Sequence, residues 1–252
     1  MASSVHTRKE SFVPPPNLPP EAGVVGKCRF AARRIMDLMV ASVLRHLEPW
    51  LAGQNGSLLD VGCGAQPYRH MVPKVCHYQG LDWKEADIHF NYSTEDTRYY
   101  SGASFPFPDA AFDALFHTEV LEHVYDFRFF LKECKRVLKP GSSMFFTVPF
   151  QARYHYIPHD YWRFTPSSLT RLLDESGFKD VVIISRGTDI TVASYKIISV
   201  IYRWILGGPF GKLIGAAVSP ICVIALLTGH ISICWNLGSL DDCLGYVVTA
   251  RA

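Results

Sequence analysis

The stretch Ser57-Leu-Leu-Asp-Val-Gly-Cys-Gly-Ala65 decides the fold of this chain. Its apolar residues predict a buried strand that carries Asp60 near its end, and the Gly-x-Gly that follows predicts a tight turn where backbone can approach a ligand closely. A second apolar segment, Tyr78-Gln-Gly-Leu-Asp82, also ends in an acid. Acids at the carboxyl ends of neighbouring parallel strands line a nucleoside-binding crevice, where the second acid accepts hydrogen bonds from the ribose hydroxyls.

The residues around the glycine turn restrict the choice of nucleoside. A dinucleotide fingerprint needs a third glycine three residues after the second, but Pro67 stands at that position. Asp60 lies just before the turn, where it would repel a pyrophosphate and attract a cation such as an amino acid's ammonium group. A ligand that combines adenine, ribose and ammonium is S-adenosylmethionine (SAM). These residues therefore favour SAM and argue against a nicotinamide-dependent oxidoreductase.

Residues 59–64 resemble motif I of the class I SAM-dependent methyltransferases, and three later segments extend the resemblance. Residues 105–113 resemble the segment that leads into strand four, and residues 117–124 resemble the segment that follows it. Residues 136–141 resemble the turn that leads into strand five. The similarity covers roughly residues 57–185 and is closest to the broad type 11 methyltransferases, which include ubiquinone and menaquinone biosynthesis enzymes. It implies an α/β fold with a doubly wound, mostly parallel, seven-stranded Rossmann-like sheet.

The resemblance also assigns residues to the cofactor site. Those expected at the methionine and sulfonium end are Asp60, Gly62, Cys63, Gly64, Thr118 and Glu119. Those expected at the ribose and adenine are Asp82, Trp83 and Asn91. The family often has an aspartate where Asn91 stands, and an amide oxygen can accept the same hydrogen bond from the adenine. Methyl transfer from SAM needs no thiol, so Cys63 is expected to be a small filler residue.

The candidate catalytic residues lie in a polar loop after the expected fifth strand. Residues 149–165 read PFQARYHYIPHDYWRFT and resemble a segment of a bacterial subgroup of type 11 enzymes often linked to surface-glycan pathways. A base is needed only for a weak nucleophile such as a hydroxyl. His155 and His159 are the candidate bases, and Asp160 could orient His159. The alternative is a structural network of His159, Asp160 and Arg163. No metal site is predicted, because SAM chemistry does not require one.

The chain divides into five expected segments. These are a proline-rich, flexible arm (1–23), an amphipathic helix that covers the core (24–56), the SAM-binding core (57–186), a hydrophobic helical insertion (187–243) and a final strand (244–252). The arm lacks the apolar region of a secretory signal.

Helix starts and strands within the core can be predicted locally. Asp126 is an expected N-cap, as is Thr165 with Pro166 at the first helical position. The expected strands are 57–61, 77–81, 114–118, 144–148, 178–185 and 245–251.

The insertion is the second most informative region. Residues 213–235 carry no charge unless His230 is protonated, and this length can span a bilayer. A single span would place the final strand on the wrong side of the membrane from its sheet. Three alternatives follow: a buried or pocket-lining helical pair, a peripheral membrane element through residues 190–235, and a true span.

Bulk properties narrow the remaining classes of function. A net charge of +2 argues against a nucleic-acid-binding surface. The seven cysteines form no CxxC pair, which favours reduced thiols. The expected location is therefore the cytoplasm, and association with a membrane is the alternative. The expected activity is methyl transfer from SAM to a small or lipid-linked acceptor, such as a glycan precursor or a quinone-like ring. The rival hypothesis is a SAM-binding scaffold or regulator without turnover. No oligomeric state is predicted.

Overall fold

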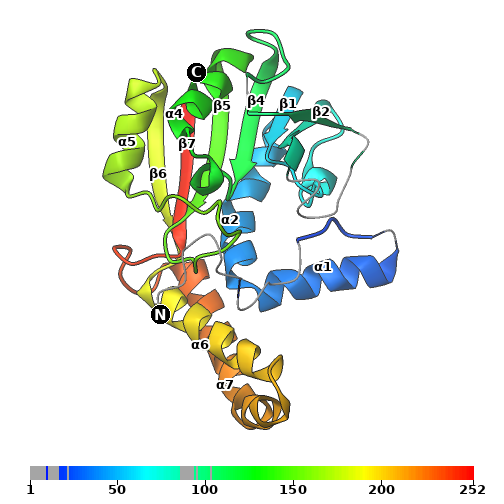
Figure 1. Ribbon diagram of the computed structural model, residues 1–252, viewed down its shortest axis with the longest axis vertical. Coiled ribbons are helices and arrows are strands. Elements are labelled where there is room, and N and C mark those ends of the chain that lie inside the picture. Colours follow the sequence, from blue (N-terminus) through cyan, green and yellow to red (C-terminus); the bar gives the residue numbers. More distant parts are fainter. Residues whose placement is uncertain (1–9, 11–16, 22, 86–93, 95, 103) are drawn as a thin grey trace.

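A seven-stranded sheet forms the centre of the molecule (Figure 1). The computed structural model describes residues 10, 17–21, 23–85, 94, 96–102 and 104–252. The strands are β1 (Gly56–Val61), β2 (Cys76–Trp83), β3 (Thr97–Tyr100), β4 (Phe112–Thr118), β5 (Leu138–Pro149), β6 (Lys179–Arg186) and β7 (Gly245–Arg251). Their order is β3-β2-β1-β4-β5-β7-β6, and only β7 is antiparallel to its neighbours. The expected mostly parallel, seven-stranded fold is confirmed.

The strand order reverses beside β1, and that point positions the site. β1 lies between β2 and β4 and pairs in parallel with both, so Asp60 aligns with Gly80 on one side and Phe116 on the other. The carboxyl ends of these strands therefore meet at one edge. Ligands of open α/β sheets bind in the crevice at such an edge.

Both faces of the sheet are buried, which explains the continuous apolar character of its central strands. Successive side chains on a strand point to opposite faces. Leu58 accordingly packs into the cluster on the face covered by α2, and Leu59 into the cluster on the face covered by α4 and α5. Phe145 and Phe146 divide between the two faces in the same way.

The two helices on the second face begin where the sequence predicts. α4 (Phe127–Val137) is capped by Asp126, which accepts a hydrogen bond from the Phe129 amide at 3.0 Å. α5 (Pro166–Glu175) begins with a capping box in which Thr165 and Ser168 bond to each other's backbone amides. Both N-cap predictions are confirmed.

The prediction of a single N-terminal helix within residues 24–56 is wrong. The chain forms α1 (Val24–Met36) and α2 (Leu38–Ala52), with Asp37 in an extended conformation between them. The Asp37 carboxylate accepts hydrogen bonds from the amides of Met39 and Val40 and so caps α2. The apolar spacing continues across the break, which is why periodicity alone did not detect it. In Figure 1, α1 extends sideways from the base of α2.

The insertion forms two long helices, as expected for a pair that returns the chain to the sheet. α6 (Asp189–Ile205) and α7 (Pro209–Trp235) pack along each other and project from the body of the protein (Figure 1). We call them the α6–α7 hairpin. Gly229 allows α7 to approach α2 closely, since a Cβ there would lie 2.5 Å from Leu38 Cδ1. α7 is long and apolar enough to cross a membrane, and only 11% of its most apolar 18-residue stretch is buried in the protein.

Candidate active site

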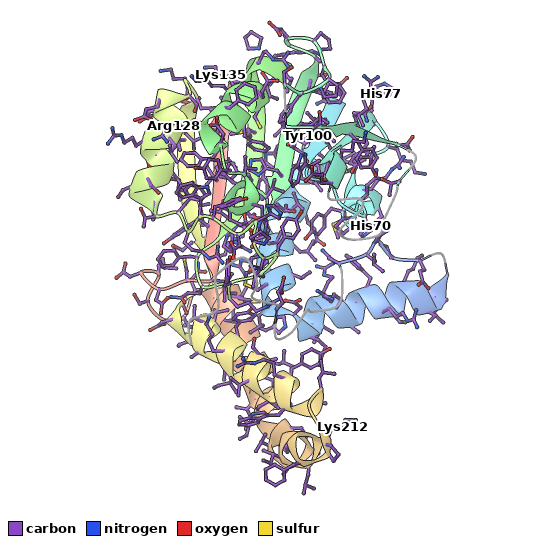
Figure 2. All side chains as sticks on the ribbon, in the orientation of Figure 1. His70, His77, Tyr100, Arg128, Lys135 and Lys212 are labelled. Carbon is purple, nitrogen blue, oxygen red and sulfur yellow. The ribbon has the colours of Figure 1, made fainter. Side chains whose placement is uncertain are left out.

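A large cavity lies at the carboxyl edge of the sheet and brings most of the predicted site residues together. Its volume is about 1690 Å³, which exceeds that of a typical small-molecule site. The predicted residues that line it are Asp60, Gly62, Cys63, Gly64, Asp82, Trp83, Thr118, Glu119, His155 and His159. Tyr100, which Figure 2 labels near the end of β3, also faces this cavity. Asn91 falls outside the described residues.

The glycine turn after β1 brings the backbone to the cavity wall. Gly62 and Gly64 have φ angles of 69° and 53°, a region that favours glycine. The Gly62 amide donates to the Leu81 carbonyl at 2.7 Å, which ties the turn to β2. A Cβ on Gly62 would lie 2.5 Å from Val120 Cγ2, so a side chain would displace the segment after β4. The neighbouring Cys63 thiol is buried, and burial raises its pKa, so it stays protonated.

Asp82 is held in a fixed orientation at the end of β2. Its carboxylate accepts hydrogen bonds from the Gly64 amide at 2.9 Å and from the Trp83 amide at 2.8 Å. A carboxylate oxygen can accept more than one hydrogen bond. The arrangement therefore suits the two hydroxyls of a ribose, which would approach over the glycine turn.

Asp60 is a buried carboxyl beside this ribose position. It is 3% exposed, and the Tyr78 hydroxyl donates to its Oδ2 at 2.7 Å. Burial raises the pKa of Asp60 to about 8. A cationic group placed against this carboxyl would favour its ionised form. The ammonium of SAM meets that requirement, so the residues of this crevice fit the ammonium and the ribose of the cofactor.

A buried arginine supports Glu119, and no pattern in the sequence predicted this contact. Arg186, at the end of β6, is completely buried and donates to Glu119 Oε1 at 2.7 Å. Thr147 of β5 donates to the same oxygen at 2.8 Å. Arg186 also donates to the Ser42 hydroxyl on α2 at 3.2 Å. The network fixes Glu119 at the cavity wall, and the buried Arg186 guanidinium balances the charge of its carboxylate.

Asp160 pairs with His155 and Arg163, whereas the sequence interpretation paired it with His159. Its Oδ2 lies 3.2 Å from His155 Nδ1 and accepts from the His155 amide at 3.0 Å. Arg163 donates to both carboxylate oxygens, at 2.6 and 2.8 Å. Burial acts to raise the pKa of Asp160, but the hydrogen bonds from Arg163 and His155 outweigh it and hold the pKa below its ordinary value. Asp160 lies behind His155 and does not line the cavity.

His159 lies at a different part of the cavity. Its Nδ1 is 3.0 Å from the Tyr161 hydroxyl. Its ring meets the Trp83 ring edge to face, with centroids 5.8 Å apart. The loop after β5 therefore presents one histidine beside Asp160 and another beside the residue expected at the adenine.

The strand order and the crevice at the carboxyl edge have the architecture that the sequence resemblance predicts for a class I SAM-dependent methyltransferase. Residues 59–146 match the family model of the type 11 methyltransferases, described as "Methyltransferase domain".

Two curated relatives and one solved structure illustrate the similarity. A probable SAM-dependent methyltransferase of Mycolicibacterium smegmatis is 30% identical over 147 residues, covering 54% of this chain and 56% of the relative. A ubiquinone biosynthesis O-methyltransferase of Idiomarina loihiensis is 30% identical over 152 residues, covering 50% and 63%. The chain thus spans less than two thirds of either relative's length. A SAM-dependent methyltransferase structure from Archaeoglobus fulgidus superposes with a TM-score of 0.54 at 18% identity, covering 89% of this chain and 99% of that one, which shows the shared fold.

Proposed function

We propose that this protein transfers a methyl group from SAM to a small or lipid-linked acceptor, such as a glycan precursor or a quinone-like ring. The observation that carries the proposal is the pair of buried carboxyls, Asp60 and Asp82, on either side of a glycine turn that opens into the 1690 Å³ cavity. This volume accommodates a nucleoside and a second reactant together.

Residues of the chain would act mainly by holding the reactants in line. SAM supplies an electrophilic methyl group when it is bound. Asp60 would bind the ammonium and Asp82 the ribose, which fixes the direction in which the methyl group faces the cavity. Orientation of two reactants can supply several kcal/mol of rate enhancement. For a hydroxyl acceptor, His155 or His159 would take the proton, and Asp160 would orient His155.

Helix α6 of the insertion lines the part of the cavity in which we place the methyl acceptor. Seven residues of α6 line it: Tyr195, Lys196, Ile198, Ser199, Val200, Tyr202 and Arg203. The same helix packs against α7, whose outer surface is apolar and exposed. The cavity is therefore continuous with the α6–α7 hairpin, and this continuity supports an acceptor that is itself apolar or presented by a lipid.

The hairpin has the surface expected of a peripheral membrane element. Between Asp189 and Asp241 the chain has no acidic residue, and its cations there are Lys196, Arg203 and Lys212. The exposed large apolar residues of α7 are Phe210, Leu213, Ile221, Val223, Ile224, Leu227, Ile231 and Trp235. Figure 2 shows Lys212 at the far end of the hairpin. Apolar side chains with lysine, arginine and aromatic residues suit an anionic bilayer interface.

A transfer assay tests the proposal. SAM labelled on its methyl group would be incubated with the protein and with two sets of acceptors, lipid-linked glycan or quinone precursors in liposomes and water-soluble sugars. We expect label in the organic phase, and at least a hundred-fold less with Asp82→Ala. If the protein binds the cofactor but labels neither set, the scaffold hypothesis gains support and the enzyme proposal fails.

A further inference from the structure

Three side chains with metal-ligand chemistry converge beside the cavity, and the two histidines among them line it. Glu122 and His123 belong to the short helix η3 (Leu121–His123) after β4, and His155 belongs to the loop after β5. One ligand atom of each lies within 4.8 Å of the other two. His123 Nε2 and Glu122 Oε1 are 3.5 Å apart. Two ligands bound about 2.1 Å from a tetrahedral metal lie roughly 3.4 Å from each other, so this pair already has the required spacing.

Glu122 is a buried carboxyl without a hydrogen bond to any described residue. Its side chain is completely buried, and within the described part of the chain neither carboxylate oxygen has a hydrogen-bond partner. Its backbone is firmly held, because the Glu122 carbonyl accepts from the amides of Tyr161 and Trp162. An unpaired buried carboxyl costs free energy. A cation between Glu122 and the two histidines would remove that cost.

Each histidine keeps one ring nitrogen available for such a cation. His123 Nδ1 lies 2.8 Å from the His159 carbonyl, and His155 Nδ1 lies 2.9 Å from the Arg153 carbonyl. A carbonyl oxygen can only accept, so Nδ1 carries the hydrogen in each ring and Nε2 keeps the lone pair. Backbone carbonyls, and a carboxylate such as Asp160 beside His155, are the outer partners that orient metal-binding histidines.

We propose that Glu122, His123 and His155 bind one divalent transition-metal ion of the zinc type. Two imidazoles and one carboxylate form the ligand set of a catalytic zinc site with an open position. His123 and His155 both line the cavity, so the open position faces the cavity. Glu119 takes no part, since its carboxylate bonds to Arg186 and Thr147.

The ion gives the site a way to activate a hydroxyl acceptor, a role that rests on the proposed function. A hydroxyl bound to the ion has a lowered pKa and loses its proton to water. The oxygen then forms its bond to the methyl carbon as the carbon–sulfur bond breaks, and the sulfonium leaves as a neutral thioether. In this scheme His155 is a ligand, and the proton acceptor is solvent.

Metal content and cobalt spectroscopy on the full chain test the proposal. Chelator-treated protein would be dialysed against zinc and analysed by mass spectrometry, and titrated with cobalt while visible absorption is recorded. We expect about one equivalent of metal and ligand-field bands for the wild type. Glu122→Gln and His155→Asn should each weaken binding at least ten-fold. His159→Asn is the matched control and should bind normally, because only its backbone carbonyl touches the cluster.

The outcomes separate this proposal from the proposed function. Circular dichroism checks that each variant folds. If Glu122→Gln does not fold, His155→Asn decides, because the His155 side chain is partly exposed. Less than a tenth of an equivalent in folded wild type, or equal binding by His155→Asn and wild type, would overturn the metal site. S-adenosylhomocysteine binding to metal-free protein is measured separately, and its loss would count against the proposed function alone.

Discussion

His117 shows how strongly burial can act on one residue. Its ring stacks on Phe146 at 4.6 Å and meets the edge of Phe130 at 5.2 Å. Among the described residues neither ring nitrogen has a hydrogen-bond partner. Burial lowers the pKa of His117 to about 3, so the folded protein holds it neutral.

Because His117 is buried and neutral, we expect the stability of the folded protein to fall at acid pH. Below about pH 6.5 the unfolded chain binds a proton at His117 that the folded chain does not, so the free energy of unfolding falls as pH falls toward 3. Proton binding at His117 lowers the free energy of unfolding by about 2 kcal/mol between pH 6.5 and pH 5. Urea unfolding of wild type and His117→Phe at both pH values measures it. The variant should lose less stability on acidification, and equal losses would contradict the assignment.

Asp60 predicts that cofactor binding releases a proton. Its pKa of about 8 leaves the carboxyl mostly protonated at pH 7, and the ammonium of an incoming ligand favours ionisation. Affinity for S-adenosylhomocysteine should therefore rise from pH 6 to pH 8. Calorimetry at pH 7 in two buffers of different ionisation enthalpy should show release of nearly one proton. Asp60→Asn should bind at least ten-fold more weakly and release none, and unchanged proton release would refute the role.

At the scale of elements, features that depend on neighbouring residues could be predicted, and features that depend on tertiary contacts could not. Asp126 and Thr165 cap helices through bonds within their own turn, so the sequence predicts them. The break at Asp37 follows the same chemistry, but uninterrupted apolar spacing concealed it. The insertion was predicted to be helical from its apolar composition, and the return of the chain to its final strand favoured a pair of helices. Its exposure could not be predicted, because that depends on what packs against α7.

The hairpin predicts binding to anionic vesicles. Ile224 and Leu227 are about 60% exposed on α7, so Ile224→Asp/Leu227→Asp should leave the fold intact and place two charges on the apolar surface. Wild type should float with vesicles that contain anionic phospholipid, and the double variant should bind at least ten-fold less. Val182→Asp, at an exposed apolar position on β6, is the matched control. Flotation of the double variant equal to that of wild type would exclude this surface.

At the scale of the molecule, the sheet and the cofactor crevice were predictable because they follow from consecutive residues. The apolar strand, the glycine turn and the acids at positions 60 and 82 occupy two short stretches, and parallel pairing brings them together. The partner of Glu119 is Arg186, 67 positions further along, and Glu122 meets His155 across two elements. No local pattern links such residues. The expected Asp160–His159 pair failed for the same reason, since loop geometry turns Asp160 toward His155.

The central claim is that Asp60, Asp82 and the glycine turn form a SAM site. Calorimetric titration of S-adenosylhomocysteine into wild type, Asp82→Ala and Asp174→Ala tests it most directly. Asp174 is an exposed acid on α5 and serves as the control. We expect micromolar binding to wild type and control, and at least a hundred-fold weaker binding to Asp82→Ala, because the ribose loses its acceptor. Equal affinity in all three folded proteins would place the cofactor elsewhere and contradict the account.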